Sequence, residues 1–159
     1  YLFGVSFALM DMAAEFSLPP NVYVLETGGM KGQRNEITRE ELHQQLQSSF
    51  SLGTIYSEYG MAELTSQAYT AGKTRFQPPP WMEVLVRPIN EPFSLKWRQE
   101  STGRLLIADL ANWATCAFIE TEDLGKIYPD GRFEVLGRLD GSEARGCKLL
   151  YRPENHLGP

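Results

Sequence analysis

The residues best suited to chemistry lie in positions 55–63, where a short apolar run ends in Tyr-Gly-Met-Ala-Glu. Tyr59 offers a flat ring on which a nucleotide base could stack, and Gly60 permits a sharp turn of the backbone. Glu63 supplies a hard oxygen ligand of the kind that holds Mg²⁺ beside a nucleotide. These three residues are therefore candidates for binding a nucleotide with magnesium. The alternative is an ordinary connection between a strand and a loop, with a buried tyrosine.

Two further segments carry glycine next to groups that suit phosphates or sugars. Residues 27–32 read Thr-Gly-Gly-Met-Lys-Gly, and backbone amides in such a loop can approach a nucleotide closely. The P-loop spacing is absent there, so a structural loop is the alternative. Residues 137–140 read Gly-Arg-Leu-Asp, in which the fork of Arg138 suits phosphate or sugar oxygens. The alternative for this segment is a hairpin exit with a surface ion pair.

Acidic residues gather in positions 120–125, Glu-Thr-Glu-Asp-Leu-Gly, beside an expected turn between strands. A carboxylate there could accept both hydroxyls of a ribose, as acidic residues do in dinucleotide sites. The alternative is a solvated charge cluster. Neither His43 nor His156 has a partner that the sequence identifies, so metal or triad chemistry through histidine is not expected.

The two cysteines differ in their surroundings. Cys147 lies near Arg145 and Lys148, and neighbouring cations can lower a thiol pKa and favour the thiolate. Its alternative is an inert cysteine. Cys116 lies in an apolar stretch and is expected in the core.

Composition narrows the class of protein. The 159 residues correspond to about one domain, with 42% hydrophobic and 22% charged residues, as in ordinary globular proteins. A formal charge of −5 disfavours nucleic acid as a partner. Two cysteines make no disulfide framework, which favours a cytoplasmic location. The sequence contains no apolar run long enough to span a membrane, and because it starts without methionine we expect a fragment of a longer protein.

The first half predicts the elements that must position these residues. Helical spacing of apolar residues indicates a helix over 5–16, followed by a short strand over 21–26. Thr38 and Glu41 form a capping box that opens a second helix ending near residue 50, and a strand follows at 53–56. Strand, helix and strand in this order predict a parallel βαβ unit, whose ligand-binding loops lie at the carboxyl ends of the strands.

The second half reads as antiparallel β-structure. Residues 77–80, Gln-Pro-Pro-Pro, suggest a stiff linker, and we expect strands at 82–87, 103–109, 115–120 and 125–136. A turn at 128–131 has proline second and glycine last, and the alternation around Phe133 and Val135 buries one face. The expected fold class is α/β followed by mainly antiparallel β, with a small barrel or sandwich. The expected division is an α/β subdomain over 1–76, a β subdomain over 81–151 and a tail over 152–159.

The order of the motifs resembles the adenylate-forming superfamily of acyl-CoA synthetases and adenylation domains. Longer matches at 25–32, 57–69 and 145–150 resemble its acyl-protein synthetase branch, which includes the fatty-acid-activating subunit of bacterial bioluminescent reductase. The resemblance covers about residues 2–151 and implies part of the large N-terminal domain of such an enzyme. The four ordered motifs are Tyr-Gly-Met-Ala-Glu (59–63), Thr-Gly-Arg-Leu-Leu-Ile (102–107), Glu-Asp-Leu-Gly (122–125) and Gly-Arg-Leu-Asp (137–140).

The resemblance implies roles for the residues at the first motif and at the glycine loop. Tyr59, followed by Gly60, would stack on adenine, with the backbone of Gly28 and Gly29 beside it. Glu63 would hold magnesium at the phosphates and take part in catalysis.

The later motifs would contact the rest of the nucleotide and the acyl group. Asp123 would bind the ribose hydroxyls, and Arg138 would reach the ribose or a phosphate. Asp140 would mark the hinge to a mobile carboxyl-terminal segment. Cys147 matches the cysteine that finally holds the acyl group in the acyl-protein synthetase branch.

The chain also departs from the superfamily pattern. Ala62 stands where threonine usually precedes the motif glutamate, and Glu122 replaces the usual glycine before the aspartate. The phosphate loop that ends in lysine and the carboxyl-terminal domain with its catalytic lysine are missing from these 159 residues. We therefore expect the phosphate loop upstream of Tyr1 and expect the 159 residues alone to be inactive.

The implied activity is ATP-dependent conversion of a fatty or other carboxylic acid to an acyl-adenylate, with transfer to a thiol. The implied cofactors are ATP and Mg²⁺, with coenzyme A as one thiol acceptor and an acyl-accepting reductase or carrier protein as a candidate partner. Two alternatives stay open. One is an acyl- or aryl-CoA ligase without a covalent acyl-enzyme, and the other is a non-catalytic domain that binds a nucleotide or a partner.

Overall fold

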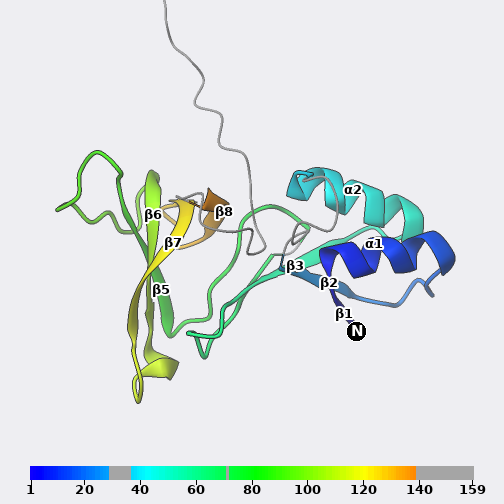
Figure 1. Cartoon of the computed structure of the whole chain (residues 1–159), viewed down its shortest axis with the longest axis horizontal. Coiled ribbons are helices and arrows are strands. Elements are labelled where there is room, and N and C mark those ends of the chain that lie inside the picture. Colours follow the sequence, from blue (N-terminus) through cyan, green and yellow to red (C-terminus); the bar gives the residue numbers. More distant parts are fainter. Residues whose placement is uncertain (29–36, 71, 139–159) are drawn as a thin grey trace, which may run out of the picture.

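A computed structural model describes residues 1–28, 37–70 and 72–138. They form two four-stranded sheets, of which the first carries both α-helices and the second is entirely antiparallel (Figure 1). This confirms the predicted fold class of α/β followed by antiparallel β. No helix within these ranges is long and apolar enough to cross a membrane.

The first sheet contains two consecutive βαβ units. Strands β1 (Leu2–Val5), β2 (Val24–Thr27) and β3 (Ile55–Tyr59) are parallel neighbours, and β4 (Ala68–Tyr69) pairs antiparallel to β3. The connecting helices α1 and α2 lie on the same face of the sheet, as Figure 1 shows. This is the arrangement expected when the strands advance in one direction, since crossovers between parallel strands are almost always right-handed. Helix α1 (Ser6–Glu15) starts one residue later than predicted, because residues 2–5 pair with β2 instead of beginning the helix.

Helix α2 (Arg39–Phe50) follows the predicted capping box. Glu41 donates its backbone N–H to Thr38 Oγ1 at 3.2 Å, and Thr38 donates its own to the Glu41 carboxylate at 2.8 Å. The helix ends at Phe50, and the cap residue Ser51 has a left-handed φ of 55°. One apolar stripe of α2 packs on the parallel strands in a buried cluster that includes Leu42, Leu46, Phe50, Val24 and Ile55.

The second sheet has the order β5-β6-β7-β8. Its strands are β5 (Met82–Arg87), β6 (Ser101–Asp109), β7 (Phe118–Ile127) and β8 (Phe133–Arg138), and the short 3₁₀-helix η1 (Leu110–Asn112) follows β6. The predicted closure into a small barrel is wrong for the described residues, because β5 and β8 are the two edges of an open sheet. Four strands are too few to close around a filled interior.

Strand β7 corrects the prediction of a turn between strands that end at residue 120 and begin at residue 125. It runs unbroken from Phe118 to Ile127, and it replaces the two strands predicted at 115–120 and from residue 125 onward. Gly125 is needed for close packing, since a Cβ atom there would lie 2.5 Å from the carbonyl oxygen of Glu134 on β8. The predicted turn at 128–131 is confirmed, with Gly131 at φ +81° donating to the Tyr128 carbonyl at 3.0 Å.

The segment between the two sheets packs against both. Phe76 and Phe133 exchange backbone hydrogen bonds of 2.7 and 3.1 Å, so residue 76 extends the edge of the second sheet beside β8. One buried cluster contains Tyr59, Leu64 and Ala68 together with apolar residues of β5 to β8. The predicted boundary between residues 76 and 81 stays a prediction, and the core is continuous across it.

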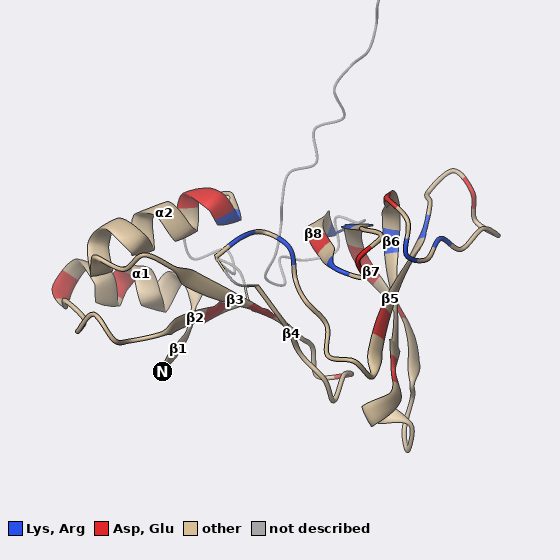
Figure 2. Cartoon of the chain, turned by 180° about the vertical axis from the view of Figure 1, so that it is seen from behind, with Lys and Arg blue, Asp and Glu red and all other residues tan. Residues whose placement is uncertain are grey.

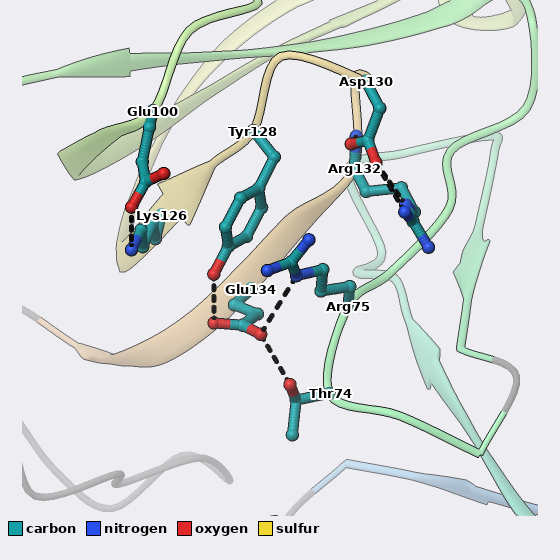
Figure 3. A network of polar contacts seen from close by, with 8 residues as sticks. All are labelled: Thr74, Arg75, Glu100, Lys126, Tyr128, Asp130, Arg132 and Glu134. Atoms are coloured by element: carbon teal, nitrogen blue, oxygen red, sulfur yellow. Dashed lines mark hydrogen bonds and ion pairs between the residues drawn. The ribbon is translucent and has the colours of Figure 1, made fainter.

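A polar network reinforces this junction (Figure 3). Glu134 accepts hydrogen bonds from Thr74 Oγ1 at 2.5 Å and from the Tyr128 hydroxyl at 2.8 Å. The guanidinium of Arg75 lies 3.6 Å from the centre of the Tyr128 ring. Burial, followed by the hydrogen bond and charge of Glu134, raises the pKa of Tyr128. The network ties the segment after β4 to the β7–β8 hairpin.

Candidate nucleotide site

Tyr59 and Asp123 lie in direct contact although 64 positions separate them in the sequence. The Tyr59 hydroxyl donates a hydrogen bond to Asp123 Oδ2 at 2.8 Å. Tyr59 ends β3, at the carboxyl edge of the parallel strands, and Asp123 lies inside β7. They are only 8% and 9% exposed, respectively. The structure therefore brings together the two residues that the sequence links to adenine and to ribose.

Arg138 extends this pair into a row of three polar groups. It lies opposite Asp123 in the register between β7 and β8. Its Nε is 3.4 Å from Asp123 Oδ1, and one of its terminal nitrogens is 3.4 Å from the carboxylate of Glu122. The guanidinium is thus held at the partly exposed end of the row, where a bound anion could reach it.

The electrostatics of Asp123 follow from its burial. Burial raises the pKa of Asp123, and the nearby charge of Glu122 acts in the same direction. The hydrogen bond from Tyr59 and the charge of Arg138 lower it but only in part. Each additional hydrogen-bond donor would therefore stabilise the ionised form of this buried carboxyl. Asp123 is thus suited to accept hydrogen bonds from sugar hydroxyls.

The Tyr59 ring packs in the core on one side of this row. It meets Phe133 edge-on at a centroid distance of 5.2 Å, and Phe76 at 5.8 Å with the rings tilted. Both contacts fix the ring plane relative to the second sheet. Adenine stacking on Tyr59 stays a prediction.

Two glycines mark the chain where β2 and β3 end. Gly28 directly follows β2 with φ +74°, a conformation that suits glycine. Gly60 directly follows β3 and is exposed. Since β2 and β3 are parallel neighbours, both glycines lie at the same edge of the first sheet, where ligands of such sheets bind. Gly29 lies outside the described residues.

Glu63 lies in a turn between β3 and β4 and is exposed. The backbone carbonyl of Glu63 accepts a hydrogen bond from Asn112 Nδ2 at 2.7 Å. The next residues are fixed by Asp109, whose Oδ2 accepts from the backbone N–H groups of Thr65 and Ser66 at 3.1 and 2.8 Å. The turn that carries the predicted magnesium ligand is therefore attached to the end of β6 and to η1.

Asp109 is fully buried, and its donors keep it ionised. Burial raises the pKa of Asp109, but the hydrogen bonds from Ser66, Ala111 and Thr65 outweigh burial and lower it. Asp109 and Asn112 were not among the residues selected from the sequence. Asp109 ends an apolar strand and caps η1 by accepting from Ala111 N–H at 3.1 Å, and an aspartate at such a position is the cap signal that could have identified it.

The described residues contain no group of three or more His, Cys, Asp and Glu side chains that could hold a metal ion. A single exposed carboxylate such as Glu63 still suits Mg²⁺, which is commonly bound through one or two carboxylates, substrate phosphates and water. Glu63 therefore fits magnesium that arrives with a nucleotide, rather than a resident metal.

A second buried polar cluster lies near the ends of β2 and β3. Glu26 is 3% exposed and accepts hydrogen bonds from Ser57 Oγ at 2.5 Å and Ser6 Oγ at 3.0 Å. His43 Nε2 lies 2.8 Å from Ser57 Oγ and 3.7 Å from Glu26 Oε1, and Arg39 Nε lies 3.4 Å from the same Glu26 oxygen. Figure 2 marks the acidic positions of β2 and β3, and at the start of α2 one basic position followed by acidic ones.

This Glu26 cluster supports the candidate site by holding the ends of the strands that lead into it. Burial by itself raises the pKa of Glu26, but hydrogen bonding with His43, the charge of Arg39 and the two serine hydroxyls outweigh burial and lower it. Glu26 stands two residues before Gly28, and Ser57 two residues before Tyr59. The sequence signal for this cluster is a glutamate at the end of an apolar strand. A carboxylate is rarely buried unless it is paired, so a glutamate at this position implies a partner.

The cysteine predictions have different outcomes. Cys116 is exposed and lies outside the strands, so its predicted core position is wrong. The reason is that β7 starts only at Phe118, and η1 and a turn precede it. Cys147, Asp140 and His156 lie outside the described residues.

Neither a family model nor a curated protein matches the chain. Solved structures do match. Unliganded o-succinylbenzoate coenzyme A synthetase (MenE) from Bacillus subtilis aligns over 86% of this chain and 32% of its own, with a TM-score of 0.58 and 18% identity. Coronafacic acid ligase from Pectobacterium brasiliense gives a TM-score of 0.57 and 18% identity, over 86% and 29% of the two chains. A benzoate CoA ligase from Burkholderia xenovorans gives 0.54 and 17%, over 86% and 30%.

The chain spans about a third of the length of these structures. At this level of identity the likeness concerns the fold. The match includes ligases of the kind that the ordered motifs resemble, and it covers most of the described residues. The α/β part and the antiparallel sheet together have the fold of a portion of a domain of adenylate-forming enzymes.

Proposed function

We propose that the complete protein activates a carboxylic acid with ATP and forms an acyl-adenylate. The observation that carries this proposal is the row of Tyr59, Asp123 and Arg138, which joins two sheets at the carboxyl edge of β3. The shared fold supports it, and one such neighbour, MenE from Bacillus subtilis, has been solved in complex with ATP and magnesium.

In the proposed reaction the substrate carboxylate attacks the α-phosphorus of ATP. The bond between the α-phosphorus and the bridging oxygen breaks, and pyrophosphate leaves with the electron pair. Asp123 would hold the ribose hydroxyls, and Arg138 would contact the ribose or a phosphate oxygen. Magnesium held by Glu63 would offset charge on the phosphates. Tyr59 would orient the base and keep Asp123 in place through their hydrogen bond.

Exchange of ³²P-pyrophosphate into ATP, measured on the complete protein with candidate acids, tests this proposal. We expect wild-type exchange and a loss of about 100-fold in D123N, because the neutral amide offers one acceptor oxygen in place of two and lacks the charge that strengthens these hydrogen bonds. Asp130 in the β7–β8 turn is exposed and pairs with Arg132, so D130N is a matched control that should keep its activity. A wild-type protein that exchanges no pyrophosphate with any acid, or a D123N variant as active as D130N, would contradict the proposal.

The acyl group would pass from the adenylate to a thiol, with AMP leaving. Two acceptors are candidates, coenzyme A and Cys147. The neighbours described as coenzyme A synthetase and CoA ligase support the first acceptor for this fold, and the resemblance to acyl-protein synthetases supports the second. Labelled acyl-protein that disappears in C147S but persists in C116S would identify Cys147, with exposed Cys116 as the matched control. Unchanged thioester formation on added coenzyme A in C147S would identify coenzyme A.

A further inference from the structure

The proposed function requires that the Glu63 carboxylate be held in a defined position. It lies in an exposed turn, closed by a hydrogen bond of 3.1 Å from Leu64 N–H to the Met61 carbonyl. A metal ligand has to be held within about 0.5 Å of its working position. Tyr59 and Leu64 bury their side chains on either side of the turn, and the Leu64 N–H bond ties the Glu63–Leu64 peptide only to its own turn.

Asn112, in the 3₁₀-helix η1 after β6, restrains the Glu63 peptide from outside the turn. Its Nδ2 donates to the Glu63 carbonyl at 2.7 Å and to the Cys116 carbonyl at 2.9 Å. Its Oδ1 accepts from Thr115 Oγ1 at 2.6 Å and from Thr65 Oγ1 at 3.0 Å. Asn112 is 9% exposed, so these four bonds are made largely away from water.

The four bonds define the orientation of the amide. A side-chain amide has two N–H donors and a carbonyl oxygen with two lone pairs, and here each one is used. A flipped amide would place its oxygen against two backbone carbonyls, Glu63 and Cys116, and its NH₂ group against two hydroxyls. The flip is therefore disfavoured, and Asn112 holds Glu63 in one backbone arrangement.

Asp109 fixes the remainder of the same turn. It binds the backbone N–H groups of Thr65 and Ser66, and its Oδ1 accepts from Ser66 Oγ at 2.7 Å. Trp81 Nε1 also donates to Ser66 Oγ, at 2.9 Å. These contacts start two residues after Glu63, so among the side-chain contacts described here it is Asn112 that bonds the Glu63–Leu64 peptide from outside the turn.

We propose that Asn112 is a positioning residue that holds the Glu63 carboxylate where it can meet the divalent cation of a nucleoside triphosphate. This inference rests on the proposed function, because it assigns Glu63 to the cation of the bound nucleotide. Loss of a residue that orients a metal ligand weakens metal binding by about 10- to 100-fold. The effect concerns the phosphate end of the nucleotide and leaves the adenosine end unchanged.

The test compares two ligands on the complete protein. Dissociation constants are measured by calorimetry for ATP over a range of Mg²⁺ concentrations, and for adenosine, which has no phosphate. In N112A we expect affinity for ATP with Mg²⁺ to fall by about 10-fold or more, with adenosine affinity unchanged. E63Q should behave in the same way, and the N112A/E63Q double variant should lose no more than E63Q alone, since both act on one interaction.

Two further variants keep the test decisive. T65V removes one hydroxyl that orients the Asn112 amide and should show a smaller loss in the same direction, even if N112A does not fold. N90A changes an exposed asparagine in the loop between β5 and β6 and should leave both ligands unaffected. Circular dichroism confirms the folding of each variant.

The results separate the two proposals. A wild-type protein that binds neither ATP nor adenosine would overturn the proposed function and this inference with it. A wild-type protein that binds ATP, with folded N112A and T65V variants that keep their Mg²⁺-dependent affinity, would overturn the inference alone. Equal losses for ATP and adenosine in N112A would also overturn it, since they would indicate a general structural role.

Discussion

The phenol of Tyr59 and the carboxylate of Asp123 form a hydrogen bond of 2.8 Å that joins the end of the parallel strand β3 to the antiparallel strand β7. Each residue is buried, so neither group can exchange this bond freely for water. The bond therefore couples the position of the predicted adenine platform to that of the predicted ribose ligand. The geometry of one half of the candidate site depends on the other half.

Removal of this bond should destabilise the protein. In Y59F the buried Asp123 loses a donor, which typically costs about 1–3 kcal/mol, and the urea midpoint should fall accordingly. The hydrogen bond lowers the pKa of Asp123, so its loss should raise that pKa further. The penalty should be larger above the pKa of Asp123 than below it, because the ionised form needs the donor most. Y23F, at an exposed tyrosine, is the matched control, and equal midpoints for the two variants would contradict the coupling.

Glu26 should also make the stability of the protein depend on pH. Its pKa is lowered from 4.5 in the folded protein, so the folded state binds this proton less tightly than the unfolded chain. The stabilisation is therefore fully present above about pH 4.5 and is lost as the pH falls through the lowered pKa. E26Q should lose about 3–5 kcal/mol at neutral pH, since it leaves Arg39 with no charged partner in the cluster.

Urea unfolding of wild type and E26Q from neutral to acidic pH measures this effect. The difference between the two proteins should shrink below about pH 4.5. Glu40 is exposed on the first turn of α2, so E40Q is a control for the loss of an acidic side chain near the same helix end. A gap between wild type and E26Q that stays constant with pH would show that the charge of Glu26 contributes nothing.

Gly125 should tolerate no side chain. A Cβ atom there would lie 2.5 Å from both the Glu134 carbonyl oxygen and a Leu105 methyl carbon. G125A should therefore lower stability by about 1–3 kcal/mol through overpacking between β7 and its neighbours. At Gly53 nothing lies within 4 Å of an added Cβ, so G53A should leave the urea midpoint nearly unchanged. Equal effects of the two substitutions would contradict the close approach of β7 and β8.

Local signals in the sequence predicted much of the fold. The capping box of Thr38 and Glu41 located the start of α2, and the turn at 128–131 located the β7–β8 hairpin. Alternating apolar residues gave β5 with its observed bounds, Met82–Arg87. In each case the interacting groups lie within a few residues of one another, so a short stretch of sequence contains the interaction that determines the structure.

The errors have non-local causes. Gly125 was predicted to start a new strand, yet it lies inside β7 and its role depends on the carbonyl of Glu134 across the sheet. Cys116 was assigned to the core because apolar neighbours do not reveal where η1 ends and β7 begins. Asn112 contacts Glu63 across 49 positions, and Ser57 contacts Glu26 across 31. Partners this distant leave no periodic signal in one sequence.

The ordered motifs, by contrast, identified residues that the fold brings together. Tyr59, Asp123 and Arg138 come from three strands and two sheets, and they meet in one row. Glu63 is exposed on the turn that follows Tyr59 by a few residues. The supporting residues behind them, Asp109, Asn112 and the Glu26 cluster, could be identified only from the structure.

The most direct measurement of the central claim is a crystal structure of the complete protein with AMP bound. We predict that both ribose hydroxyls lie about 2.5–3.0 Å from the Asp123 carboxylate oxygens. We also predict that the adenine lies against Tyr59 beside the backbone of Gly28, with Arg138 at the ribose or the phosphate. Bound AMP whose ribose does not reach Asp123, or AMP seated elsewhere on the protein, would contradict the account.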